Sequence, residues 1–71
     1  MTAPNKHTVK INGHITSVFL ESEFWEEIKQ ISKAKSVSTG QLISQIDQQK
    51  RGSNLSSAIR LYILNHIRNP R

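Results

Sequence analysis

Hydrophobic and polar positions change from a strand pattern to a helix pattern within two residues. Residues 15–20, ITSVFL, are typical of a short β-strand, and the following ESEFWEEI places apolar residues at helical spacing. A lone strand is not stable in water, so this strand needs a pairing partner. The partner is either the preceding part of the chain or a second copy of it.

An intrachain partner is indicated by residues 8–11, TVKI, which alternate polar and apolar side chains. Asn12-Gly13 follows, and this dipeptide is the strongest short signal for a two-residue hairpin turn. The hairpin would span residues 8–20. Its facing pairs would be Ile11 with His14, Lys10 with Ile15, Val9 with Thr16 and Thr8 with Ser17.

Three helices are predicted after the strand, over residues 22–35, 38–49 and 55–68. Apolar side chains recur at helical spacing in each. Ser38 and Gln41 have capping-box spacing at the start of the second helix, and Asn54 or Ser53 can cap the third. Residues 1–6 are predicted to be a flexible arm, and residues 7–71 a single domain.

The third helix has an apolar stripe wider than one contact needs. Leu61 and Leu64 extend the stripe beyond the positions that continue the core pattern. The wide stripe predicts that this helix is buried on two sides, and a dimer interface would bury the second side.

Length and composition also favour a homodimer. A chain of 71 residues buries a smaller fraction of its surface than a larger domain does, and with no cysteine it has no disulfide. His7, His14 and His66 lack a metal-ligand spacing, so we expect no metal and no cofactor. No apolar run is long enough to span a membrane and no signal peptide is recognisable, so a cytoplasmic protein of bacterial or phage origin is expected.

The charge distribution points to a polyanionic partner. The net charge is +5, and four of the five acidic residues lie within residues 21–27, at a helix start where they favour the helix dipole. The rest of the chain carries ten positive charges against Asp47 alone. A polyanion is therefore the expected partner, and the alternative is a basic surface that is merely solvated.

Catalysis has no support in the sequence. Ser17, Ser38 and Ser56 have no histidine and acid arranged with them as a nucleophilic site requires, and there is no glycine-rich phosphate loop or pair of catalytic carboxylates. We expect neither an enzyme nor a small-molecule substrate.

A strand that runs directly into a helix, followed by a Ser-capped turn and a second helix, resembles the ribbon-helix-helix DNA-binding proteins. The residues that carry the resemblance are TSVFL at 16–20, Phe24-Trp25 and Ile28, and VSTGQLI at 37–43. Residues 14–46 together with NLSSAIR at 54–60 look most like a subgroup of short bacterial proteins of that class. The fold implied is mainly α with a short N-terminal β element, as an intertwined homodimer with an extra C-terminal helix.

The resemblance implies that the strand at 15–20 pairs antiparallel with its copy, and that the resulting ribbon enters the DNA major groove. Such a protein would be a transcriptional regulator or a phage or plasmid control protein. Thr16, Val18 and Leu20 would face the core. The DNA-binding residues implied or suggested are Ile15, Ser17 and Phe19 on the outward face, Lys10 and His14 in the preceding arm, and Ser38 and Thr39 at a phosphate.

Two features depart from this pattern. The outward residues Ile15 and Phe19 are apolar, whereas the family usually presents long polar side chains there, so polar contacts would have to come from Lys10, Asn12 or His14. A hairpin in both copies would also give a four-stranded sheet roughly 19 Å wide. The major groove is about 12 Å wide, so such a sheet cannot lie flat in it.

Two other functions remain open. Residues 31–46 could form a helix-turn-helix in which residues 38–49 read DNA through Gln41, Gln45 and Gln48. Alternatively, the apolar Ile15 and Phe19 could belong to a dimerisation or protein-interaction module that does not read DNA.

Overall fold

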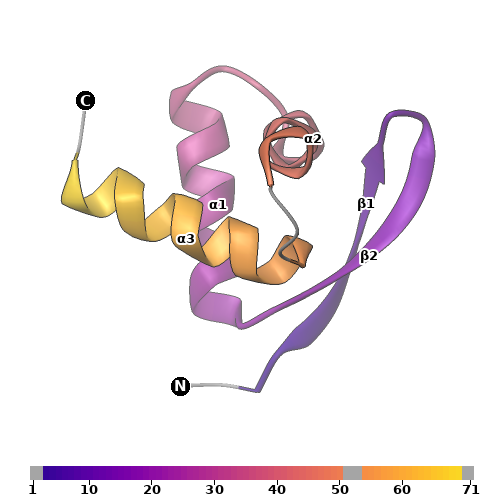
Figure 1. Ribbon diagram of the computed structural model, residues 1–71, viewed down its shortest axis with the longest axis horizontal. Helices are drawn as coiled ribbons and strands as arrows, with labels where there is room; N and C mark the ends of the chain where they lie inside the picture. The colour runs from indigo at the N-terminus through magenta and orange to yellow at the C-terminus, as the bar shows by residue number, and fades with distance from the viewer. Residues whose placement is uncertain (1–2, 51–53, 70–71) are drawn as a thin grey trace.

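The computed structural model describes residues 3–50 and 54–69, which form a β-hairpin followed by three helices (Figure 1). Strands β1 (Asn5–Ile11) and β2 (His14–Leu20) form a two-stranded antiparallel sheet. Helices α1 (Ser22–Ala34), α2 (Thr39–Gln49) and α3 (Leu55–Arg68) follow. The predicted architecture, a short N-terminal β element with an additional C-terminal helix, is confirmed.

A tight turn at Asn12 and Gly13 closes the hairpin. Their φ angles are 52° and 81°, as a two-residue hairpin turn requires. Lys10 faces Ile15 and Thr8 faces Ser17, which is the predicted register. The chain therefore supplies its own partner strand, and one edge of β2 is filled by β1.

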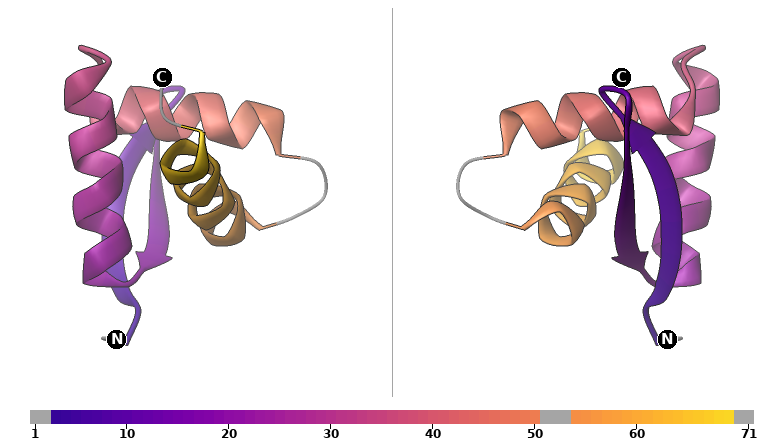
Figure 2. Two further views of the ribbon diagram at one scale, coloured as in Figure 1. Left: turned by 90° about the vertical axis from the view of Figure 1, so that its left-hand side faces the viewer. Right: turned by 90° about the vertical axis from the view of Figure 1, so that its right-hand side faces the viewer.

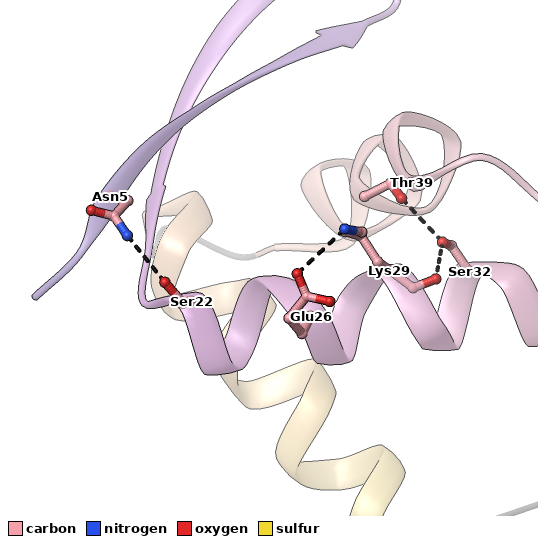
Figure 3. A network of polar contacts seen from close by, with 6 residues as sticks. All are labelled: Asn5, Ser22, Glu26, Lys29, Ser32 and Thr39. Carbon is pink, nitrogen blue, oxygen red and sulfur yellow. Dashed lines mark hydrogen bonds and ion pairs between the residues drawn. The ribbon is translucent and has the colours of Figure 1, made fainter. Parts of the chain in front are cut away.

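The hairpin is longer than predicted. β1 begins at Asn5 instead of residue 8, so Asn5 and Lys6, which were expected in the flexible arm, belong to the strand. The Asn5 side-chain amide donates a hydrogen bond to the Ser22 hydroxyl at 3.1 Å, as Figure 3 shows. His7 stacks on Trp25 with ring centroids 4.0 Å apart. These contacts with α1 explain why the strand extends beyond the alternating TVKI segment.

The helix boundaries lie within one residue of those predicted. The capping box of α2 is present, since the Gln41 N–H donates to the Ser38 hydroxyl at 3.0 Å and the Ser38 N–H donates to the Gln41 side chain at 2.8 Å. The Asn54 side chain accepts a hydrogen bond from the Ser57 N–H at 2.8 Å and caps α3. The two helices thus begin where these side chains satisfy free backbone donors.

One hydrophobic core joins both strands to all three helices. Figure 2 shows the hairpin lying against one side of the helices. α2 packs against β1, and α3 packs against β2. The buried apolar residues are Val9, Ile11, Val18, Leu20, Ile28, Ile31, Leu42, Ile43, Ile46, Ile59 and Ile63. A single chain therefore encloses a continuous core beneath its own two-stranded sheet.

The outer side of α3 is not covered. Leu61, Leu64 and Ile67 are 46–58% exposed, while Ile59 and Ile63 on the other side of the helix are buried. Of the two sides of α3 that were predicted to be buried, the chain itself covers only one. Contact of the other side with a second copy stays a prediction.

No helix in residues 3–50 and 54–69 combines the length and the apolar character needed to cross a membrane.

Candidate nucleic-acid interface

The apolar side chains on the two faces of the hairpin differ sharply in burial. Period-two geometry places Val18 and Leu20 on one face of β2, where they are 1% and 0% exposed, with Thr16 half-buried beside them. Ile15 and Phe19 lie on the opposite face and are 77% and 52% exposed. The predicted orientation of the strand is confirmed, and its outward side is free of core contacts.

The outward face combines two rows of side chains. Ser17 lies between Ile15 and Phe19 on β2 and is exposed. Across from these three residues lie Lys10, Thr8 and Lys6 of β1, all of which are exposed. Opposed side chains in an antiparallel pair are close enough to act on the same ligand. The face therefore presents two ammonium groups, two hydroxyls and two apolar groups.

Lys6 and Thr8 were not among the DNA-binding residues predicted from the sequence. Part of the signal was present, because residues 8–11 alternate and the buried Val9 and Ile11 leave the even-numbered positions outward. The even-numbered positions lie on the same face as Ser17, so the whole face could have been predicted once β1 was assigned as a strand.

Lys10 and His14 lie near the turn. Lys10 faces Ile15, so it lies on the outward face with the other candidate residues. His14 pairs across the strands with Ile11, next to the turn. The His14 side chain is exposed, whereas the Ile11 side chain is buried. His14 therefore borders the core side of the ribbon, at the turn, instead of joining the row formed by Ile15, Ser17 and Phe19.

The predicted phosphate site at the start of α2 lies beside β1. The Ser38 hydroxyl is engaged in the capping box, and the Thr39 hydroxyl lies 3.2 Å from that of Ser32 (Figure 3). Their backbone N–H groups are at the positive end of the helix dipole, with no acidic residue in the first turn. A hollow of about 440 Å³ brings Ser38 together with Lys10.

α2 is packed closely on the hairpin at this point. A Cβ on Gly40 would lie 3.0 Å from the Lys10 carbonyl oxygen, so only glycine permits this approach without displacement. The Ser44 hydroxyl donates to the Asn12 side-chain oxygen at 3.2 Å. The first turn of α2 is thus held against β1, which hinders its entry into a groove as a recognition helix, although Gln41, Gln45 and Gln48 are exposed.

Acidic side chains are absent from the hairpin sequence, residues 5–20. Glu21, directly after β2, is bound by Arg60 of α3, with nitrogen–oxygen distances of 3.0 and 3.2 Å. The Arg60 guanidinium donates these hydrogen bonds and holds the pKa of the Glu21 carboxyl below its usual value near 4.5. Glu26 pairs with Lys29 at 3.3 Å on α1 (Figure 3). The outward face of the hairpin therefore keeps the positive charge of its two lysines.

No group of three histidine or acidic side chains that could bind a metal ion occurs in the part of the chain that the structure describes. A hollow of about 770 Å³ is an open surface feature between the end of α1 and the start of α2. Its lining residues Ser32 and Thr39 bond to each other through their hydroxyls. These groups are used in packing, and they offer no catalytic arrangement.

The chain matches a known family along most of its length. The family model described as "Ribbon-helix-helix domain" matches residues 4–67, a span that runs from just before β1 almost to the end of α3. Neither the curated proteins nor the solved structures contain a significant match to this chain.

Proposed function

This chain belongs to the ribbon-helix-helix domain family, whose members are DNA-binding regulators and not enzymes, and on that premise we propose that it binds duplex DNA through the outward face of its hairpin to control transcription. The observation that carries the proposal is the exposure of Ile15, Ser17 and Phe19 on an acid-free hairpin whose other face supplies Val9, Ile11, Val18 and Leu20 to the core. A cellular DNA partner also implies action in the cytoplasm, on the nucleoid.

The chemistry of these side chains suits the edges of base pairs. Ser17 can exchange hydrogen bonds with several bases, and Ile15 and Phe19 can contact thymine methyl groups in the major groove. Lys10, opposite Ile15, can reach a guanine edge or a phosphate. We expect these contacts to favour sites that contain thymine.

Phosphates beside the groove would be bound near the turn. Lys10 and Ser38 line one hollow, and the free backbone donors of Thr39 and Gly40 lie at the start of α2. An anion there would meet both an ammonium group and a helix N-terminus. His14, exposed at the turn, would add a further contact to the sugar-phosphate backbone.

We further propose a homodimer, with the outer side of α3 as the contact between copies. Leu61, Leu64 and Ile67 recur every three residues and are uncharged, so the same stripe on a second copy can cover them. The contact would leave both hairpins free for DNA. Sedimentation should give twice the 8.1 kDa chain mass, and Leu64→Lys should give the single-chain mass, whereas Gln48→Lys on the exposed side of α2 should not. A wild-type protein that sediments as a single chain at micromolar concentration would contradict the dimer.

The DNA-binding proposal is tested by fluorescence anisotropy with random duplex DNA at 50 and 200 mM salt. We expect affinity to fall steeply with salt, because each neutralised phosphate releases counterions. Ser17→Ala and Phe19→Ala should weaken binding without unfolding the chain, and Gln48→Ala should not. Binding that depends on Gln41, Gln45 and Gln48 instead would support the helix-turn-helix. No binding at 50 mM salt would contradict the proposal and favour a dimerisation or protein-interaction module that uses the apolar Ile15 and Phe19.

A further inference from the structure

The ribbon of this protein is already two-stranded within one chain. Each outward residue of β2 faces an outward residue of β1. The facing pairs are Ile15 with Lys10, Ser17 with Thr8, and Phe19 with Lys6. A two-stranded ribbon is the element that fits the major groove, and two strands spaced about 4.8 Å apart make it roughly 10 Å wide. One chain therefore holds a groove-sized ribbon without a second copy.

The two rows differ in chemistry, and β1 carries what β2 lacks. Ile15, Ser17 and Phe19 offer one hydroxyl and no charge, which provides little to bind a guanine edge or a phosphate. Lys6 and Lys10 provide two ammonium groups at the two ends of the face, with Thr8 between them. The missing polar contacts are thus found on the adjacent strand of the same chain.

β1 is fixed in this position by contacts along its length. At its start Asn5 bonds to Ser22, and His7 stacks on Trp25. At its end the Lys10 carbonyl lies against Gly40, and Val9 and Ile11 are buried in the core. A strand held by its side chains and at both ends is not a detachable arm, so it occupies the place that a partner's strand would otherwise take.

A ribbon made from two copies of β2 would be too wide. The second copy would have to use the other edge of β2, and the sheet would then have four strands. At roughly 19 Å such a sheet exceeds the groove width of about 12 Å. The hairpin of a single chain has no such conflict.

We propose that β1 is the second reading strand, so that Lys6, Thr8 and Lys10 contact DNA together with Ile15, Ser17 and Phe19 of the same chain. This inference rests on the proposed DNA binding and adds to it the residues and the strand that complete the ribbon. The two lysines bind phosphates or guanine edges at the margins of the contact, and the β2 row lies over the base pairs between them.

The experiment compares Lys6→Gln and Lys10→Gln with Lys33→Gln, an exposed lysine of α1 outside the hairpin, in the anisotropy titration. Each hairpin variant should lose at least about fivefold in affinity at 100 mM salt, and its salt slope should fall by about one if that lysine contacts a phosphate. The control removes the same charge from the chain and should bind within about twofold of wild type. Wild-type affinity in both hairpin variants would overturn the inference while leaving the DNA-binding proposal intact.

Hydrogen exchange in the complex then tests whether β1 stays paired. The amides of residues 5–11 should be as protected with DNA as without it, or more so. Loss of protection on binding would show that β1 detaches and that β2 reads DNA without it, which would overturn the inference. Absence of wild-type binding at low salt would overturn the inference and the proposed function together.

Discussion

The two faces of the hairpin share one turn and one backbone, but it is mainly the side chains of the inner face that stabilise the fold. Val9, Ile11, Val18 and Leu20 are 0–8% exposed on one face, whereas Ile15 and Phe19 on the other are more than half exposed. Burial of apolar surface stabilises a fold, and exposed apolar side chains contribute little. The outward face is therefore free to vary without loss of the fold, and under the proposed function its composition determines recognition.

Substitution of one buried and one exposed residue on β2 gives the largest expected contrast. Leu20→Ala should lower the free energy of unfolding by about 2–5 kcal/mol, because it removes a fully buried side chain and leaves a cavity. Phe19→Ala should lower it by about 1 kcal/mol or less. Urea denaturation measures both, and equal losses would show that the outward face is covered in solution.

The turn should have the next largest effect, because it fixes the register of both faces. Gly13 has a φ of 81°, and a Cβ at this position would meet no atom within 4 Å beyond its chain neighbours, so Gly13→Ala introduces backbone strain without a clash. We expect a loss of about 1–2 kcal/mol by thermal denaturation. Gly13→Asn, which tolerates this region better, should lose less. A similar loss in both variants would mean that the turn conformation is not what holds the register.

The smallest effect is expected from the ion pair that joins the end of β2 to α3. Because Arg60 lowers the Glu21 pKa in the folded state, the pair stabilises the fold above the usual pKa near 4.5, and this contribution is lost as the pH falls through the lowered folded-state value. Urea midpoints between pH 2.5 and 7 should fall more steeply on acidification in wild type than in Glu21→Gln. Parallel curves would show that the pair does not contribute.

The sequence allowed the elements to be predicted closely, because their signals are local. The capping box at Ser38 and Gln41, the Asn12-Gly13 turn and the helical spacing of apolar residues each act over a few positions. These signals determined the helix boundaries to within one residue. Period-two geometry divided the side chains of β2 between two faces, and the resemblance to the family indicated which of the two faces the core.

The choice of strand partner could not be made from the sequence, because an intrachain and an interchain partner satisfy the same backbone hydrogen bonds. The contacts that favour β1 are long-range. Asn5 with Ser22, His7 with Trp25 and Gly40 with the Lys10 carbonyl join segments 17 to 30 residues apart. No local pattern announces such contacts, so the extension of β1 to Asn5 and the place of Lys6 in the strand were missed. Thr8, in contrast, lies in the alternating segment at residues 8–11 and could have been assigned to the outward face.

Amide chemical shifts during a titration with duplex DNA show whether one outward face, made by both strands of one chain, contacts DNA. We expect the largest changes at Lys6, Thr8, Lys10, Ile15, Ser17 and Phe19, with small changes along the exposed glutamines of α2. Changes concentrated at Gln41, Gln45 and Gln48, with the hairpin amides unmoved, would contradict this expectation.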